Sequence, residues 1–394
     1  MDVTGCPVTN AGIKGLCSND YAGYETNYET RRMGQCKLIH TLKMKKTKIS
    51  KEGIKVALEN LTKLKIFEFY RSVQILAEIR RDNLERGYFK TYSITKFECT
   101  KFMDELFGNI LPYESRSLRL VATLCPFVNV VHITLQPGLT DFELCGLLEL
   151  KVGGLRELKI EDHVVGDREW ENNEITFDCG VLPLLKAFGS SLVSLTLYEL
   201  NICVNIRAII ELCPHLEHLI LQSVDFYSIA SLREESNHHR KDVSLKHLKK
   251  LRVVSEFWGS TDFSSEMLSM VLSSPGLVSL EFFGCDALTD DVLEEAARLH
   301  EFQKLELLDF SCCDNVTKKG IDFILNERNP LRSLCVNYCS MIRQWEFDEW
   351  NNKAREENLE IEFNFEADSE SEPESDSDVE FVNDSDDMDV IDFD

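Results

Sequence analysis

The chain of 394 residues lacks any stretch suited to a membrane or to export. No run of about 18 apolar residues occurs, so we expect no transmembrane helix. The first 18 residues hold one lysine and no long apolar segment, which is not the pattern of a secretory signal. We therefore expect the 14 cysteines to stay reduced, in the cytoplasm, the nucleus or both.

Sequence patterns that carry catalysis are missing as well. The glycine-rich phosphate loop, the Gly-x-Ser-x-Gly nucleophile turn and the His-Glu-x-x-His zinc motif do not occur. Each of these chemistries needs its residue types at a fixed spacing, because the side chains must meet at one point. We therefore expect a protein that is not an enzyme and that holds no cofactor.

Positive charge is scarce, since 43 Lys and Arg face 68 Asp and Glu and leave a net charge of −25. Residues 366–394 alone hold 14 acids and no base. An acidic chain repels phosphates, so we expect no nucleic-acid partner. Low apolar content and a charge of one sign predict that 366–394 is a disordered tail.

Four serines in this tail resemble the acidophilic target pattern of casein kinase 2. Ser369, Ser371, Ser375 and Ser377 each have an acid three residues later. They are candidate phosphorylation sites of a regulatory segment. A tail that only keeps the protein in solution would have the same composition, and the sequence leaves both readings open.

The chain does contain one short sequence pattern that recurs many times. Leu277-x-x-Leu280-x-Phe282-x-x-Cys285 recurs 28 residues later and then 26 residues after that. Self-similarity at this period is typical of a leucine-rich repeat. The same frame starts at Ile39, Leu64, Ile94, Val128, Leu155, Leu192, Leu216, Leu248, Leu277, Leu305 and Leu331.

The repeat predicts an α/β fold, a horseshoe-shaped leucine-rich-repeat solenoid. Its alternating part suits a short strand, and a turn and a helix follow. Thr9, Ser50 and Thr317 stand where helix N-caps belong. Parallel strands should line the concave face and helices the convex face, because neither layer can bury its apolar side alone.

We expect this solenoid to fill residues 1–365 with about 11 to 12 repeats. Met1 and Val3 fall on the second and third apolar slots of a frame, so the chain starts in the middle of a repeat. A helix and an alternating segment near 341–365 suit a cap at the other end. Polar insertions at 161–174 and 233–242 suit surface loops.

Cysteines recur in one slot after the strand. Cys6, Cys285, Cys313 and Cys339 share it, which predicts a packing role. Stacked strands would hold these side chains in a column with a spacing of about 4.8 Å. Such a column does not converge on one metal ion, so we expect no metal site.

One outward position changes its residue type from repeat to repeat, as expected of a recognition surface. It follows the third apolar slot, and we take it as a candidate protein-binding row on the concave face. Tyr198 and Phe283 are its best anchors, because aromatic side chains supply much of the energy at interfaces. The row consists of Thr134, Glu161, Tyr198, Gln222, Val254, Phe283, Ser311 and Asn337.

The repeats resemble those of F-box/leucine-rich-repeat proteins. The resemblance lies in the lead-in Cys213-Pro214-His215-Leu216 and in the turn Cys285-Asp286-Ala287-Leu288. It implies a protein-binding module that holds a substrate for ubiquitin-dependent degradation. In that family an F-box docks the protein, through an adaptor subunit, onto a cullin-based SCF-type ligase. No F-box occurs in this chain, and one upstream of Met1 would supply that docking.

A second resemblance keeps another function open. Acidic leucine-rich nuclear phosphoproteins also join repeats to an acidic tail, although their tails are longer and their repeats are poor in cysteine. That resemblance implies a scaffold that is no part of a ligase and whose tail binds basic nuclear proteins.

Overall fold

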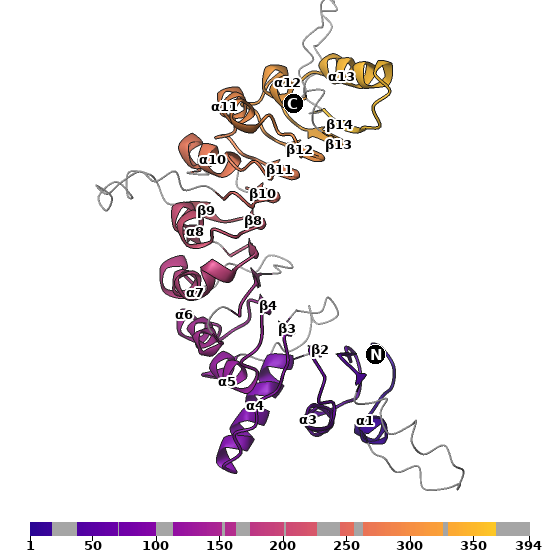
Figure 1. Cartoon of the computed structure of the whole chain (residues 1–394), viewed down its shortest axis with the longest axis vertical. Coiled ribbons are helices and arrows are strands. Elements are labelled where there is room, and N and C mark those ends of the chain that lie inside the picture. Colours follow the sequence, from indigo (N-terminus) through magenta and orange to yellow (C-terminus); the bar gives the residue numbers. More distant parts are fainter. Residues whose placement is uncertain are drawn as a thin grey trace, which may run out of the picture.

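The protein is an elongated arc of stacked strand-and-helix units in the computed structural model (Figure 1). Strands line one side of the arc, and helices form a row along the other. The structure describes residues 1–17, 38–69, 71–99, 113–151, 154–162, 174–200, 202–226, 245–255, 263–325 and 330–367.

One parallel sheet of 12 strands runs the whole length of the arc, with its strands in chain order. A second sheet pairs only the short strands β7 (Cys203–Val204) and β9 (Asp225–Phe226). The long sheet contains β1 (Thr41–Lys43), β2 (Ile66–Glu68), β3 (Lys96–Cys99), β4 (Val130–Thr134), β5 (Glu157–Glu161), β6 (Ser194–Tyr198), β8 (His218–Gln222), β10 (Lys250–Val254), β11 (Ser279–Phe283), β12 (Leu307–Ser311), β13 (Ser333–Asn337) and β14 (Glu362–Glu366).

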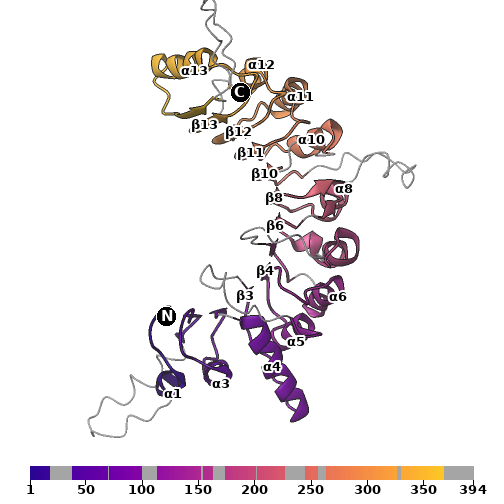
Figure 2. The same ribbon diagram turned by 180° about the vertical axis from the view of Figure 1, so that it is seen from behind.

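The helices cover the convex side, and α4 extends past the row formed by the others (Figure 2). Short 3-10 segments at Cys145–Glu149 and Gly189–Ser191 and a π-helical turn at Phe177–Val181 complete this layer. The α-helices are α1 (Asn10–Cys17), α3 (Lys51–Asn60), α4 (Ser72–Glu85), α5 (Ser117–Leu124), α6 (Asp141–Leu144), α7 (Leu182–Phe188), α8 (Ile206–Leu212), α10 (Ser265–Leu272), α11 (Asp290–His300), α12 (Lys318–Ile324) and α13 (Gln344–Glu356).

The strand register confirms the repeat frame and, with it, the leucine-rich-repeat solenoid. Leu280 pairs with Leu308, which pairs with Leu334, and all three side chains are fully buried between sheet and helices. The repeats that start at Leu64 and Ile94 agree too, since their fourth residues, Phe67 and Phe97, are buried. The core is therefore one apolar layer that continues from repeat to repeat, as a stack of units requires.

The two ends of the sheet carry strands with one neighbour each. At the start, Asp2 bridges Lys43 in parallel, and the Val3 N–H donates to the Lys43 carbonyl at 2.9 Å. Met1 and Val3 thus extend the sheet in the frame that the repeat assigns to them. At the other end, helix α13 precedes β14, which pairs with β13. No helix among the described residues is long and apolar enough to cross a membrane.

Three of the four predicted ladder cysteines lie in the core. Cys285, Cys313 and Cys339 are buried, and the Cys313 thiol lies 3.4 Å from the Ser311 carbonyl and 3.8 Å from that of Phe282 in the preceding strand. Cys6 is exposed, so its predicted packing role is wrong.

Several predicted segments lie outside the described residues. They are the central parts of both insertions, 163–173 and 233–242, and the candidate phosphorylation sites Ser369, Ser371, Ser375 and Ser377. Their roles stay predictions.

Candidate protein-binding surface

The concave face presents every second side chain of each strand, because successive side chains of a strand point to opposite faces. In the five-residue strands from β4 to β13, the second and fourth residues are buried in the core, and the first, third and fifth form three outward rows. In β14 the second and fourth residues, Phe363 and Phe365, are partly buried. The register aligns these rows across the sheet. The sequence alternation had predicted only the row at the fifth position as a binding surface.

The predicted row is continuous in the structure. Thr134 pairs with Glu161, and the pairing continues in register through every member to Asn337. Glu366 of β14 extends the row by one residue. The sequence therefore brought together side chains from eight repeats that do lie side by side.

Half of this row is not accessible, so four of the eight predicted contact residues are not available to a partner. Thr134, Glu161, Gln222 and Ser311 are buried. Tyr198, Val254 and Asn337 are partly exposed, and Phe283 is the most open, with 38% of its surface exposed.

The third-position row was missed, and it carries most of the charge of the face. Lys43, Glu68, Glu98, His132, Lys159, Arg252, Glu281 and Asp309 belong to it. The sequence did contain the information needed to predict this row. A residue between two core positions of a strand must point to the opposite face, whatever its type.

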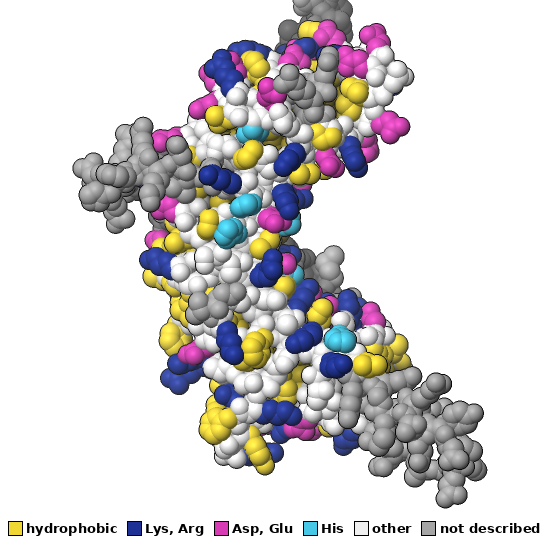
Figure 3. Space-filling view, viewed as in Figure 1, with side chains coloured by type: hydrophobic (Ala, Val, Ile, Leu, Met, Phe, Trp, Pro, Cys, Tyr) yellow, Lys and Arg dark blue, Asp and Glu magenta, His cyan; other side chains and the backbone are white. Residues whose placement is uncertain are grey.

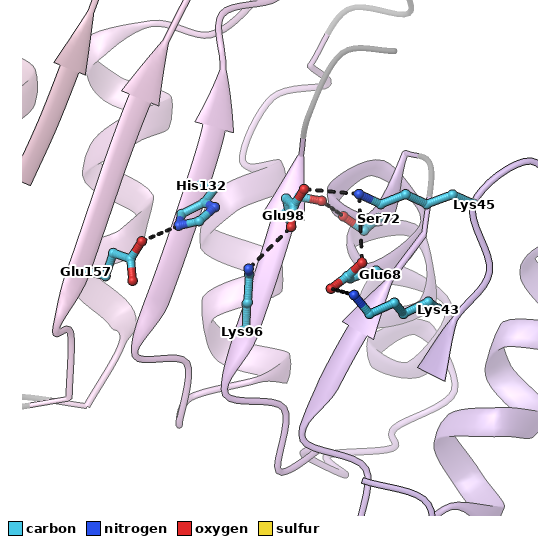
Figure 4. A network of polar contacts seen from close by, with 8 residues as sticks. All are labelled: Lys43, Lys45, Glu68, Ser72, Lys96, Glu98, His132 and Glu157. Carbon is cyan, nitrogen blue, oxygen red and sulfur yellow. Dashed lines mark hydrogen bonds and ion pairs between the residues drawn. The ribbon is translucent and has the colours of Figure 1, made fainter. Parts of the chain in front are cut away.

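An ion-pair network occupies the face over β1 to β4 (Figure 4). Lys45 Nζ lies 3.1 Å from Glu98 and 3.8 Å from Glu68, and Lys43 lies 3.2 Å from Glu68. Lys96 approaches Glu98 at 3.4 Å. Burial by itself raises the pKa of Glu98, but the hydrogen bonds and charges of Lys45 and Lys96 outweigh it and hold that pKa below its usual value.

The network continues toward β5 through a histidine. His132 Nε2 lies 2.7 Å from a Glu157 carboxylate oxygen on the adjacent strand, as Figure 4 shows. Lys159 pairs with Glu161 at 2.5 Å. Charges on this part of the face thus satisfy one another across neighbouring repeats.

A second network covers β10 and β11. Glu281 accepts from Lys250 at 2.6 Å and from Arg252 at 2.9 Å. Burial raises the pKa of Glu281, yet the hydrogen bond and charge of Lys250, with the charge of Arg252, lower it further than burial raises it. On the next strand, burial raises the pKa of Asp309, and the nearby Glu281 charge adds to the rise.

Between the two networks the face is uncharged over β6 and β8 except for His218. Thr196, Tyr198 and Ile220 lie there, and Val254 and Phe283 continue the apolar character beside the second network. Uncharged and apolar side chains lose little when a partner removes water from them, whereas paired charges resist that loss. We name Tyr198, Ile220, Val254 and Phe283 the central strip.

The part of the chain that the structure describes contains no cluster of side chains that could ligate a metal ion. No group of three or more His, Cys, Asp or Glu side chains there lies close enough together to hold an ion.

Comparisons with known proteins give little beyond the fold. No protein-family model and no curated protein sequence matches the chain. A solved structure, the crystal structure of the Rad7 and Elc1 complex in yeast, is similar with a TM-score of 0.43 and 12% identity over 79% of this chain and 66% of that chain. The present chain thus spans about two thirds of the length of that solved chain. The leucine-rich-repeat assignment rests on the register and burial of the repeats themselves.

Proposed function

We propose that this protein is a binding module rather than an enzyme, and that it holds another protein on its concave face through the central strip. The main support for the proposal is the difference in charge between the central strip and the rest of the concave face. Ion pairs within and between repeats cover β1 to β5 and the first and third positions of β10 and β11, while the strip is uncharged and includes an aromatic ring that is 38% exposed.

An interface needs a few desolvated anchors ringed by polar residues. Phe283 and Tyr198 are such anchors, because aromatic side chains bury large areas at a small entropic cost. Lys250, Arg252 and Glu281 stand beside them as a polar rim. This arrangement suits a partner segment with apolar side chains at its centre and charged groups at its edge.

The role of substrate-recognition subunit or adaptor in an SCF-type ubiquitin ligase is the finer proposal. It is supported by the resemblance of the repeats to F-box/leucine-rich-repeat proteins, and it puts the protein in the cytoplasm, the nucleus or both. An F-box supplied from outside these residues would connect the repeats to the cullin and its adaptor subunit. The concave face would then select the protein to be degraded.

The test compares two variants that each replace an exposed apolar side chain with serine. Phe283→Ser removes an anchor from the concave face, and Leu299→Ser removes a 62% exposed leucine from α11 on the convex side. Affinity purification of the protein from cells, followed by quantitative mass spectrometry, is expected to lose its specific partners with Phe283→Ser and to keep them with Leu299→Ser. Equal partner lists for both variants would refute binding through the central strip.

The ligase role has a separate readout. A purification from the full-length gene product that never contains a cullin or its adaptor subunit contradicts that role and leaves the binding surface itself intact.

A scaffold whose acidic tail binds basic nuclear proteins is the second candidate. Its support is the run of 14 acids without a base in 366–394. Contacts of this kind weaken with salt, because they are mainly electrostatic. If deletion of 366–394 leaves every partner bound, this candidate fails.

A further inference from the structure

Over the middle of the sheet, the two edges carry charges of opposite sign. The pattern does not extend to its ends, where Lys45, Lys46 and Lys48 follow β1 and Glu301 and Glu306 precede β12. We define the strand-start rim as the connections that lead from each helix into strands β2 to β10, and the strand-end rim as the connections that follow strands β5 to β12. Among the described residues, the strand-start rim holds eight bases, Lys63, Lys65, Arg86, Lys90, Lys151, Arg156, Lys246 and Lys249, and one acid, Glu217.

The strand-end rim has the reverse composition. Its described residues include no base and six acids, Asp162, Glu174, Glu199, Asp225, Asp286 and Asp314. The net charge of −25 hides this polarity, because it sums over both rims and the acidic tail. Lys and Arg side chains spread along the face shown in Figure 3, from the lower repeats to the middle of the arc.

The bases of the strand-start rim are open to a partner. All eight are exposed. Lys249 pairs with Glu217 at 2.7 Å, while Lys63, Lys65, Arg86, Arg156 and Lys246 form no ion pair with another described residue. Like charges gathered without counter-charges raise the local potential, which favours an anionic partner.

Apolar surface accompanies this charge. Tyr88 and Phe89, beyond the end of α4, are 61% and 73% exposed, and Phe127, in the connection before β4, is 46% exposed. Lys151 Nζ stands 4.1 Å from the centre of the Phe127 ring. A phosphate backbone needs only the positive charge. A segment that combines acids with aromatic side chains uses both features of the rim.

The chain contains such a segment. Residues 368–394 lie outside the described residues and hold 13 acids, no base, and the apolar residues Phe381, Ile391 and Phe393. We propose that this C-terminal segment docks in cis on the strand-start rim of its own solenoid. Acids would lie against the exposed bases, and Phe393, near the end of the segment, would contact the apolar rings of the rim.

The length of the segment suits this contact. A flexible chain of 27 residues has an r.m.s. end-to-end distance of about 30 Å and a fully extended length of about 90 Å. Strand β10 lies four strands from β14, which is about 19 Å at the spacing of a sheet, and crossing a five-residue strand adds about 17 Å. Phe127, before β4, is eight strands from β14, about 38 Å, so only the last part of an extended segment reaches it. The segment begins beside the acidic strand-end rim, which repels it toward the basic one.

A titration tests the contact. A labelled peptide with the sequence of 368–394 is added to protein that ends at Ala367. We expect binding at 50 mM salt that weakens at least tenfold at 300 mM, because counter-ions screen the contact. The full-length protein is expected to bind the peptide at least tenfold more weakly than the shortened one, since its own tail competes at high effective concentration.

Matched variants show where the peptide binds. Lys65→Glu, Arg156→Glu and Lys246→Glu together reverse three charges of the strand-start rim. Lys14→Glu, Lys186→Glu and Lys353→Glu reverse three exposed charges on the convex helices and change the net charge equally. The first triple variant is expected to weaken peptide binding at least tenfold and the second less than threefold. Absence of binding at 50 mM salt, or equal effects of both, overturns the proposal.

Two further outcomes distinguish other occupants. Carbodiimide joins a carboxylate to a lysine that it contacts, and we expect links from the tail to Lys246 or Lys249 in the monomeric fraction of the full-length protein. Links found only in covalent dimers overturn docking in cis. If the shortened protein binds a single-stranded oligonucleotide of 20 bases more tightly than the peptide, the rim is a nucleic-acid site and the proposal is wrong.

Discussion

The carboxylate of Asp290 holds Thr317 of the following repeat with both of its oxygens. The Thr317 N–H donates to Oδ1 at 2.9 Å, and the Thr317 hydroxyl donates to Oδ2 at 2.6 Å. The same hydroxyl accepts from the Lys319 N–H at 3.2 Å and so caps helix α12, as the sequence predicted. One acid at the first position of a helix therefore positions the next helix in the stack.

The contact recurs along the arc. Asp141 binds the N–H and hydroxyl of Thr176, each at 2.7 Å. Asn10 binds Ser50 in a related way: its Oδ1 accepts from the Ser50 N–H at 2.9 Å, and its amide nitrogen donates to the Ser50 hydroxyl at 2.8 Å. That hydroxyl does not accept from the first turn of α3, although Ser50 is the N-cap residue. The predicted N-cap residues Ser50 and Thr317 thus link neighbouring repeats as well as stand at the start of a helix.

Loss of the Asp290 carboxylate should destabilise the solenoid. Asp290→Ala removes two hydrogen bonds and exposes part of the α12 N-terminus, which should lower the free energy of unfolding by about 1–3 kcal/mol. Urea unfolding followed by circular dichroism measures the change. Asp291→Ala is the control, because Asp291 is exposed and also lies in the first turn of α11. Equal losses in both variants would contradict a role beyond the helix dipole.

Gly320 is required by the same contact. A Cβ atom at Gly320 would lie 2.3 Å from Asp290 Oδ1, too close for any relaxed structure. Alanine ordinarily stabilises a helix by up to about 1 kcal/mol relative to glycine, but Gly320→Ala should destabilise the protein by about 1–3 kcal/mol. Gly15→Ala, in α1 with nothing within 4 Å of the new Cβ, should be neutral or stabilising.

A double variant tests whether contact between the new methyl group of Gly320→Ala and the Asp290 carboxylate causes the loss of stability. Asp290→Ala makes room for the methyl group, so Gly320→Ala should cost much less in that background than in the native protein. Additive losses in the double-mutant cycle would show that the two residues act independently.

Two acids on adjacent strands, Glu281 and Asp309, should change the free energy of unfolding with pH in opposite directions. The pKa of Glu281 is lowered in the folded protein, so its contribution is present above the unfolded pKa and disappears as the pH falls through the folded value. The pKa of Asp309 is raised, so the folded state loses stability as the pH rises from the unfolded value through the folded one.

Neutral replacements test these signs. At pH 7, Glu281→Gln should lower the midpoint of thermal unfolding and Asp309→Asn should raise it. Both differences should shrink as the pH falls below about 4, where the carboxyls of the native protein become protonated. Unfolding scans between pH 3 and 7 are the measurement, and a stabilising Glu281→Gln at pH 7 would reverse the assignment.

The buried cysteines should resist alkylation while the fold is intact. Burial raises the pKa of Cys125, Cys213 and Cys285 to about 12, so almost no thiolate forms at neutral pH. Iodoacetamide at pH 8, followed by peptide mass spectrometry, should modify the exposed Cys6 and Cys179 first. In urea all five should react at similar rates, and early labelling of Cys285 in the native protein would contradict its place in the core.

The central strip shows how far sequence reasoning reaches. Phe283 and Tyr198 were predicted in one outward row, and the register confirms that row because strand alternation and the repeat spacing are local properties. Gln222 and Glu161 belong to the same row yet are buried, since their exposure depends on tertiary packing. Ile220 was missed because only one of the three outward positions had been considered.

The repeat frame by itself determined the fold. The fourth and sixth positions of each repeat are apolar and can be removed from water only in the layer between strand and helix. Leu280, Leu308 and Leu334 are buried in that layer. Only the tertiary structure decided which side chains of different repeats meet, such as Lys45 with Glu98 and Asp290 with Thr317. Those contacts join residues 53 and 27 positions apart in the sequence, and stacking distance, not local pattern, brings them together.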